Sequence, residues 1–257
     1  MLDAHPLDPP TADELEASLR AVLGPADAEV ALRLAAREAL PGLPGLADLG
    51  PEQLVALARG LIRQRGLAAI IGRSFEIRMI SYLELPATTK AGPRPPAEPE
   101  DERLAALAAL DLGDDLDDPR LTAAVARAAD SLGLPIAAVS LVLDRAQYFA
   151  ASQGLPPWIA SARGTPDEWA LCRQVVRSGQ PFVVDDAAHD PRLPDNPLVE
   201  LDHVRCYLGV PLTARDGQVL GTLCAIGTAP HRFGEADVAR MRELADEVVA
   251  ALEARRR

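Results

Sequence analysis

The sequence contains no long hydrophobic run, few cysteines and little clustered basic charge. A membrane-spanning helix needs roughly 18 consecutive apolar residues, and no segment approaches that length. The first residues also lack the basic and then apolar pattern of a signal peptide. We therefore expect a cytoplasmic protein that does not bind membranes.

Three of the 257 residues are cysteines, and their spacing argues against the common cysteine chemistries. Cys172, Cys206 and Cys224 form no CxxC pair and no cysteine and histidine pattern of a metal site. The four histidines show no spacing typical of a catalytic triad or of a metal site. The sequence thus predicts reduced thiols in a core, no metal site, no catalytic residue and no enzyme activity.

Acidic residues outnumber basic residues, 38 to 26, and the formal net charge is −12. Such a chain repels the phosphate backbone of nucleic acids and anionic membrane surfaces unless basic residues are clustered. One basic run, at 255–257, follows the last predicted helix, where it complements the partial negative charge of a helix C-terminus. Nucleic acid is therefore not an expected partner.

The first third of the sequence has the pattern of a small helical domain. Residues 1–10 contain three prolines and no periodicity, which predicts a flexible lead-in. In residues 11–85, a capping box at Thr11 and Glu14 begins the first of four expected helices. Residues 86–100 contain five prolines and no large apolar side chain, which is typical of a semi-rigid linker. The expected helices cover 11–23, 26–40, a segment that begins at 50, and 67–85.

After residue 100 the pattern changes from helical to mixed. β-Branched and apolar runs of five to nine residues indicate strands, and Asp216 with Gly217 gives the strongest hairpin-turn signal in the sequence. The expected elements are helices that begin at 101 and 119, strands 136–143 and 147–152, a helix 167–178, a strand 181–185, strands 204–212 and 219–226, and a helix 235–254.

This order of elements, together with several residue strings, resembles the GAF domain family. The strings are 132–142 (LGLPIAAVSLV), 165–172 (TPDEWALC), 190–199 (DPRLPDNPLV), and 207–212 (YLGVPL) with 221–224 (GTLC). The resemblance covers residues 101–257 and implies an α+β fold, in which a GAF-like antiparallel sheet with helices on both faces follows a small all-α domain. It also implies a pocket on one face of the sheet and signalling through the flanking helices. Residues 11–85 resemble no family.

Two activities found in that family are not supported by these residues. GAF domains that bind cyclic nucleotides often carry an Asn-Lys, Phe and Asp-Glu constellation, whereas here Pro197 follows Asn196 and Val238 follows Asp237. Phytochrome-like GAF domains attach a bilin through a cysteine in a Cys-His setting, and no cysteine here has a histidine beside it. The residues therefore identify neither a ligand nor a cofactor.

Alternation along the last predicted hairpin assigns its residues to two faces of the sheet. If the loop has two or four residues and no bulge, each cross-strand pair joins an odd-numbered residue to an even-numbered one. One face then carries Arg205, Tyr207, Thr222 and Cys224, and the other carries Val204, Cys206, Leu208, Leu223 and Ala225. The first face is polar enough for a ligand, and helix 167–178 with loop 186–203 would cover it.

The predicted pocket joins this first face to residues of neighbouring segments. Trp169 and Cys172 lie three residues apart on the expected helix and can point into the pocket, although ordinary core packing explains them equally. A charged residue within a strand needs a partner, so Arg205 either pairs with an aspartate or binds an anionic ligand. The candidate pocket residues are Tyr148, Trp169, Cys172, Asp185, Asp186, Arg205, Tyr207, Thr222 and Cys224.

The last predicted helix carries an apolar stripe with alternating spacings of three and four residues. Such a stripe is typical of a coiled-coil seam and favours a homodimer, but it can also pack within one chain. The candidate interface residues are Leu104, Leu107, Val238, Met241, Ala245, Val248 and Leu252.

Together these observations predict a cytoplasmic signal-transduction regulator. Its GAF-like domain would bind a small molecule, a partner protein or both, and pass the signal through flanking helices to a downstream signalling protein. One alternative is a ligand-free scaffold for protein contacts. Another is a GAF-type free methionine sulfoxide reductase, which needs a nucleophilic thiolate and a resolving cysteine within reach; the cysteine positions do not resemble that family.

Overall fold

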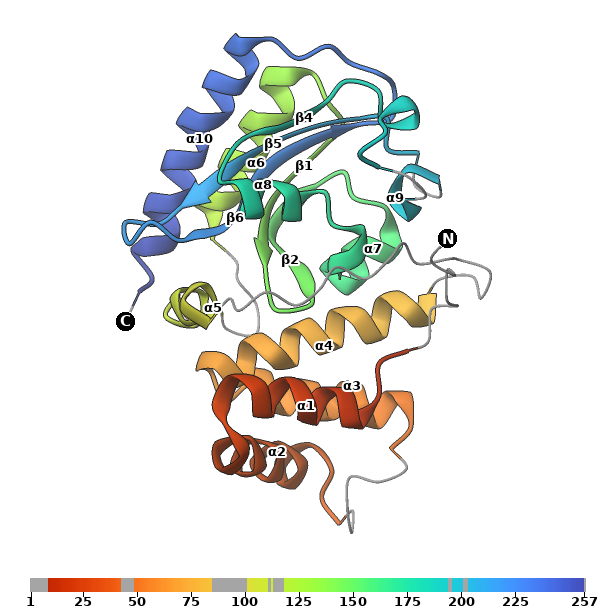
Figure 1. Cartoon of the computed structure of the whole chain (residues 1–257), viewed down its shortest axis with the longest axis vertical. Coiled ribbons are helices and arrows are strands. Elements are labelled where there is room, and N and C mark those ends of the chain that lie inside the picture. Colours follow the sequence, from red (N-terminus) through yellow and green to blue (C-terminus); the bar gives the residue numbers. More distant parts are fainter. Residues whose placement is uncertain are drawn as a thin grey trace.

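The computed structural model describes residues 9–42, 49–84, 101–110, 112, 118–193, 196–200 and 203–256. Within these ranges an antiparallel sheet carries helices on both faces, and a group of four helices lies beyond one end of the sheet (Figure 1). The α+β fold predicted from the sequence is confirmed. The predicted linker at 86–100 and most of the predicted lead-in lie outside the described residues.

The four N-terminal helices are α1 (Ala12–Leu23), α2 (Pro25–Ala39), α3 (Pro51–Ile62) and α4 (Gly66–Glu84). The Thr11 side chain accepts a hydrogen bond from the backbone amide of Glu14 at 3.3 Å, so the predicted cap begins α1. These helices share a core that includes Leu19, Leu61 and Phe75. Gly72 lets α3 and α4 approach closely, because a Cβ there would meet the Ala58 carbonyl oxygen at 2.7 Å.

Helix α4 packs on both the helical group and the sheet, and Figure 1 shows it between them. Ile71 and Met79 belong to the core of the four helices, whereas Ile70 and Ile77 belong to the core under the sheet. The helix is therefore apolar on two sides. Neighbouring apolar residues such as Ile70 and Ile71 point to different sides of a helix, and this places one in each core. The division into two domains at 86–100 stays a prediction.

The sheet contains six strands in the order β3-β2-β1-β6-β5-β4, and every neighbouring pair is antiparallel. The two predicted hairpins lie next to each other and supply the four central strands of the sheet. The strands are β1 (Ile136–Val142), β2 (Ala146–Gln153), β3 (Gly164–Pro166), β4 (Phe182–Val184), β5 (Cys206–Thr213) and β6 (Val219–Gly227).

One face of the sheet, here called the long-helix face, is covered by α5 (Asp101–Ala108), α6 (Pro119–Leu132) and α10 (Glu235–Glu253), with part of α4. The other, here called the roofed face, is covered by short elements. They are α7 (Pro157–Ala162), a 3₁₀ turn at Asp167–Trp169, α8 (Cys172–Ser178), a 3₁₀ turn at Ala187–His189, and α9 (Pro197–Glu200).

The single helix expected at 167–178 is wrong. Ala170 has an extended backbone, with φ −74° and ψ 106°, and this separates the turn at Asp167–Trp169 from α8. The sequence analysis also did not predict α7 and β3, which bring residues 157–166 back to the edge of the sheet. Gly164 permits this approach, since a Cβ there would lie 2.1 Å from the Gln147 carbonyl oxygen.

The apolar stripe of α10 is buried within the chain. Leu104, Leu107, Met241, Ala245, Val248 and Leu252 are at most 4% exposed, and Val238 packs against the same core. Helix α10 lies on β5 and α6, which cover the stripe. The stripe is thus part of the core, and the predicted dimer interface at these residues is wrong.

None of the helices in the described ranges combines the length and the hydrophobicity that crossing a membrane requires.

Candidate functional site

The two central strands place their side chains as alternation predicts. Tyr207 lies opposite Ile226 and Leu208 opposite Ala225, so cross-strand partners have opposite parity. Next to the turn, however, Thr213 pairs with Val219, so both partners are odd-numbered. A bulge at Leu212 and Thr213 then shifts the register, and from Leu212 onward each pair joins an odd-numbered residue to an even-numbered one. The predicted faces of the hairpin are right although the predicted bulge-free loop is wrong. Val204 is the exception, because it precedes β5 and packs with the roofed face.

A cavity of about 40 Å³ lies between the roofed face and its cover. Its floor includes Phe149, Tyr207 and Cys224, and its cover includes Ile159 of α7 and Leu198 of α9. None of the described residues that line the cavity is charged. The full lining is Ile136, Gln147, Phe149, Leu155, Pro156, Ile159, Thr165, Leu171, Cys172, Leu198, Val204, Tyr207, Cys224 and Ile226.

Two thiols and a phenol meet at the wall of this cavity. The Tyr207 hydroxyl donates a hydrogen bond to Cys172 Sγ at 3.3 Å. The Cys224 thiol donates to the Ala138 carbonyl oxygen at 3.6 Å and lies near enough to Cys172 to influence its acidity. Thr222 lies behind them, with its hydroxyl 3.4 Å from the Cys172 carbonyl oxygen, to which it donates. The structure therefore brings together four of the predicted pocket residues, from α8, β5 and β6.

These contacts change the acidity of the groups that make them. The interaction with the nearby Cys224 thiol, with smaller contributions from nearby hydroxyls, outweighs burial and lowers the pKa of Cys172 to about 7. The same interaction and burial raise the pKa of Cys224, and burial raises the pKa of Tyr207. Of the two thiols in the cluster, Cys172 is therefore the one that ionises first as the pH rises.

A second group of polar side chains crosses the floor of the cavity. Ser140 donates to Gln147 Oε1 at 3.1 Å, and Gln147 Nε2 donates to Thr165 Oγ1 at 2.7 Å. All three side chains are at most 3% exposed, so each needs these partners. Gln147 and Thr165 line the cavity and offer it a carbonyl and a hydroxyl.

The cover of the roofed face is connected to α4. Trp169 is fully buried and packs edge-on against Tyr82 of α4, with ring centroids 5.8 Å apart, and against Trp158 at 6.3 Å. The Tyr82 hydroxyl donates to Glu168. Trp169 therefore holds the cover against the helical region and does not line the cavity.

Besides Trp169, four predicted pocket residues lie elsewhere. Tyr148 points to the long-helix face, opposite to the cavity. Asp185 accepts from the Phe233 amide at 3.2 Å, and Asp186 accepts from the Ala188 amide at 3.2 Å and contacts His189, so both aspartates order loops. The placement of the two aspartates depends on loop geometry, which alternation does not describe, whereas Tyr148 follows the alternation of β2.

Arg205 is the fourth of these residues. Its guanidinium donates to the carbonyl oxygens of Val199 at 2.7 Å and Val204 at 3.0 Å. Among the described hydrogen bonds, neither predicted aspartate binds it, and Arg205 makes the smallest of the contributions that lower the pKa of Asp186. Among the described contacts, its hydrogen-bond partners are thus backbone carbonyls of the cover, and the predicted pairing with an aspartate is wrong. Binding of an anionic ligand by Arg205 stays a prediction, for a place outside this cavity.

The sequence analysis missed the polar floor of the cavity. Gln147 belongs to no motif, and Thr165 was noted only as the first residue of the string 165–172. The two side chains meet only because the unpredicted strand β3 pairs with β2. A signal was available in Pro156 and Pro157, since proline is common at the first turn of a helix and α7 begins there. Within the described residues there is no cluster of three or more side chains suited to a metal ion.

Comparison with known proteins adds to this geometry. A GAF domain family model matches residues 116–253. A cyclic di-GMP phosphodiesterase of Pseudomonas aeruginosa is 35% identical over 161 residues, which cover 61% of this chain and 27% of that protein. The chain therefore spans about a quarter of the length of this curated relative.

Solved structures show lower identities. The GAF domain of a phosphoenolpyruvate-protein phosphotransferase from Acinetobacter is 19% identical over 60% of this chain and 92% of its own, with a TM-score of 0.45. A free methionine-R-sulfoxide reductase from Neisseria meningitidis, solved with its substrate, is 21% identical over 63% of this chain and 96% of its own, also with a TM-score of 0.45.

The family match confirms the resemblance drawn from the four strings of the sequence. The expectation of no enzyme activity is contradicted, because the curated relative is named as a phosphodiesterase. That expectation depended on the absence of a catalytic motif in these residues. A search for motifs takes no account of relatives, such as this one, that are much longer than the chain.

Proposed function

The chain belongs to the GAF domain family, and we propose that its sheet and helices form the sensory unit of a signalling protein, with the cavity of the roofed face as the ligand site. The observation that carries this proposal is the composition of that cavity. Its wall is apolar except for a few convergent polar groups, among them Tyr207, Gln147 and Thr165. Small-molecule sites in proteins have this composition.

The same wall defines the chemical class of the ligand. The described lining holds no arginine, lysine, histidine or carboxylate, and its one group that ionises near neutral pH is the Cys172 thiol, so an anion would lose its hydration without gaining a partner. A volume of about 40 Å³ holds little more than ordered water, so a larger ligand must displace the cover. We therefore propose a small uncharged molecule with an apolar body and one or two hydrogen-bonding groups.

The cover supplies a route for the signal. α7 and α9 cover the cavity, and Trp169 and Glu168 connect the cover to Tyr82 of α4. Helix α4 contributes to the core of the four N-terminal helices. A ligand that displaces the cover therefore biases the position of α4, and through it the helical region.

The curated relative indicates the signalling system in which this unit acts. Because that relative is named as a cyclic di-GMP phosphodiesterase and the match covers 27% of it, we propose that the shared segment regulates the turnover of a cyclic dinucleotide second messenger. The output would then pass through the helical region to a catalytic domain or to a downstream signalling protein.

A pair of hydroxyl deletions on the two faces of the sheet tests the ligand site. Native mass spectrometry of freshly purified protein should show a retained small molecule. Tyr207→Phe removes a polar group from the cavity and should reduce the retained fraction several-fold. Tyr148→Phe is the matched control, because its hydroxyl is buried on the long-helix face without a hydrogen-bond partner among the described residues.

Two outcomes would contradict the ligand proposal. Wild-type protein without any retained molecule, and without a thermal shift in a screen of small uncharged compounds, would favour the ligand-free scaffold. Equal loss of the molecule in Tyr148→Phe and Tyr207→Phe would place the ligand outside the cavity.

The contact between Cys172 and Cys224 favours a second candidate, thiol-dependent reduction of free methionine sulfoxide. In that reaction the sulfoxide oxygen leaves as water while the two thiols become a disulfide, which an added dithiol then reduces. Turnover that disappears in both Cys172→Ser and Cys224→Ser, but persists in Cys206→Ser, would identify this activity.

A further inference from the structure

Exposed apolar side chains gather on one helix of the N-terminal group. Among the described residues, three large apolar side chains are exposed: Val30 at 55%, Leu34 at 52% and Leu83 at 51%. Val30 and Leu34 both belong to α2 and lie four residues apart, so they project from the same side of the helix, one turn from each other. A single exposed apolar residue is common on protein surfaces, but these two neighbours form a small apolar surface.

One charged residue lies at each end of this surface. Asp27 lies three residues before Val30. Arg37 lies three residues after Leu34, and both charged side chains are exposed. The four residues are thus spaced by three, four and three positions, which aligns them along one side of a helix as in a coiled-coil seam. We call Asp27, Val30, Leu34 and Arg37 the α2 stripe.

The α2 stripe lies on the outer side of the helical group. Helix α2 packs on α1 and α3, at the end of the group that is farther from the sheet (Figure 1). Its buried side chains, among them Leu32 and Ala35, belong to the core of the four helices. Because the stripe projects from a different side of α2, a partner reaches it without displacing that core.

The two charges of the stripe differ from the other charges of α2. Arg33 pairs with Glu29 of the same helix, whereas the ion pairs within the described residues include neither Asp27 nor Arg37. The two charges also have opposite sign and lie at opposite ends of the stripe, Asp27 in the first turn of α2 and Arg37 in the last. The stripe is therefore complementary to a copy of itself that is turned end to end.

We propose that two copies of this chain associate through their α2 stripes, with the two helices antiparallel. A two-fold axis level with residue 32 places residues at equal distances before and after that position opposite each other. Val30 of one copy then contacts Leu34 of the other copy. At each end, Asp27 of one copy meets Arg37 of the other. Since the axis relates the two copies, each contact occurs twice, and the same arrangement satisfies both the apolar and the charged residues.

The charge pattern also selects the orientation of the two helices. A parallel pair would place Asp27 against Asp27 and Arg37 against Arg37, so like charges would meet at both ends. In the antiparallel pair, the N-terminus of each α2 lies beside the C-terminus of the other, where the partial charges of the helix ends attract. A stripe that complements itself in this way fits a second copy better than an unrelated protein.

An interface of one helix pair is small. Helix α2 has 15 residues and is therefore about 22 Å long, and interfaces below the standard size of about 1,600 Å² are generally weak and transient. We therefore expect a dimer that dissociates on dilution. This inference does not depend on a ligand in the cavity of the roofed face, and it concerns a different surface from the buried stripe of α10.

Exchange of charges between two variants tests the arrangement. Sedimentation velocity of the full chain over a range of concentrations should show monomers and dimers in equilibrium. Asp27→Arg alone and Arg37→Asp alone should each weaken the dimer at least about tenfold, because two attractive contacts become repulsive. An equimolar mixture of these two variants should dimerise as the wild type does, since one copy then carries two positive ends and the other two negative ends. Asp246→Arg is the matched control, because it reverses the same charge on an exposed position of α10, and it should leave the dimer unchanged.

Leu34→Ser tests the apolar centre of the stripe without a change of charge. Leu34 is exposed in the single chain, so this variant should keep its fold, as circular dichroism will show, but it should dimerise at least about tenfold more weakly. Leu83→Ser is its matched control, since Leu83 is equally exposed but belongs to α4, and it should dimerise as the wild type does.

Three results would overturn the inference. A wild type that stays monomeric at the highest concentration would leave the stripe to a different protein. A dimer that persists unchanged in Leu34→Ser would place the interface elsewhere on the chain. A mixture of Asp27→Arg and Arg37→Asp that dimerises no better than either variant alone would show that the two helices are not antiparallel in this register.

Discussion

The two faces of the sheet are covered in different ways. On the long-helix face, α6 has 14 residues and α10 has 19, and the side chains between them and the sheet are almost all aliphatic. On the roofed face, α7 has six residues, α8 seven and α9 four, and they enclose thiols, hydroxyls and an amide. The same strands therefore carry a core on one side and a site on the other.

This difference implies different mobility. Short helices gain little stability of their own, and segments with few apolar contacts open at lower free energy than a packed core. The cover of the roofed face can thus move while α6 and α10 keep the sheet intact. A sensory unit needs this combination, because a ligand can only shift an element that has a second accessible position.

The largest effect should follow from a charge placed under the long-helix face. Val248 is 1% exposed and faces the core below α10. Val248→Asp buries an unpaired carboxylate, so we expect the free energy of unfolding to fall by more than about 4 kcal/mol. Urea denaturation followed by circular dichroism measures this change.

Ala250→Asp is the control for that substitution, since it adds the same charge to an exposed position of α10 and should leave stability almost unchanged. Sedimentation of the same variants addresses the coiled-coil alternative. If Val248→Asp stays folded and converts a dimer into a monomer, α10 forms an interface between chains and our description of this face fails.

A smaller loss of stability is expected within the cover of the roofed face. Arg173 of α8 pairs with Asp167, and both residues are 8% exposed. Arg173→Met keeps most of the side-chain volume but leaves the carboxylate without this partner, which should cost about 3 kcal/mol. Because the pair lies in the cover, we also expect faster hydrogen exchange in α8 than in α10.

Arg127→Met is the matched control for the buried pair, because it breaks an exposed ion pair between α6 and α10 and exposed pairs contribute little. Equal increases of hydrogen exchange in α8 and α10 of Arg173→Met would show that the two faces unfold as one unit, contrary to the comparison above.

The sequence predicted the regular elements well and the site only partly. Periodicity located α6, α10 and the four long strands within a few residues, because each buries one continuous apolar face. Alternation placed Tyr207 and Cys224 on one face, since a bulge near the turn restored the expected parity. Tyr207 and Cys224 then meet Cys172 because α8 covers that face.

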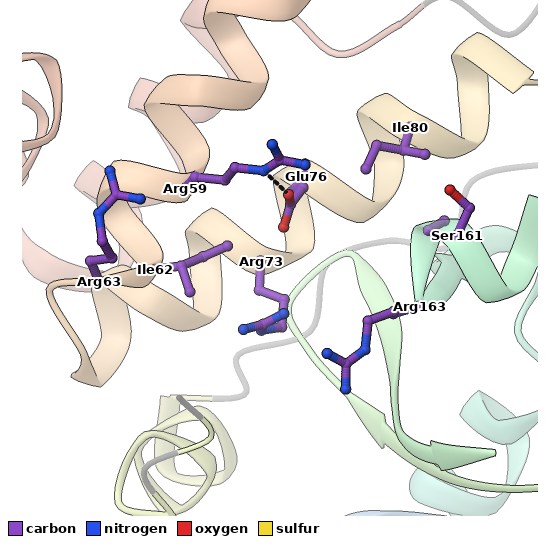
Figure 2. A pocket seen from close by; sticks show the side chains of 9 residues that line it. Arg59, Ile62, Arg63, Arg73, Glu76, Ile80, Ser161 and Arg163 are labelled. Carbon is purple, nitrogen blue, oxygen red and sulfur yellow. Dashed lines mark hydrogen bonds and ion pairs between the residues drawn. The ribbon is translucent and has the colours of Figure 1, made fainter. Parts of the chain in front are cut away.

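What the sequence could not show depends on loops and on long-range contacts. Asp186 and Arg205 hydrogen-bond to backbone groups nearby in the sequence, which polar side chains in irregular segments often do, whereas Asp185 accepts from the distant Phe233 amide. A pocket of about 340 Å³, whose lining includes Arg63 and Arg163, joins α3, α4 and α7 across about a hundred residues of sequence (Figure 2). No spacing rule connects Arg63 with Arg163, because only the packing of α4 on the sheet brings them together.

The last prediction compares two thiols on opposite faces and involves the smallest change in stability. Cys172 has a pKa lowered to about 7 by the Cys224 thiol and nearby hydroxyls, whereas burial raises the pKa of Cys206 under the long-helix face. An ordinary thiol titrates near about 8.5. The ultraviolet absorbance should therefore rise between about pH 6 and 8 by the amount that one thiolate per chain contributes. Ionisation of Tyr207 should not interfere, because its pKa is raised.

Three substitutions assign that transition to its group. Cys172→Ser should abolish it, and Cys206→Ser, the matched change on the opposite face, should leave it in place. Cys224→Ala removes the donor with the largest influence on Cys172, so the midpoint should move to higher pH. Since the anion forms above the midpoint, raising the pKa lowers the thiolate fraction at neutral pH. A transition that survives Cys172→Ser, or a midpoint that stays in place in Cys224→Ala, would show that the roofed face does not activate this thiol.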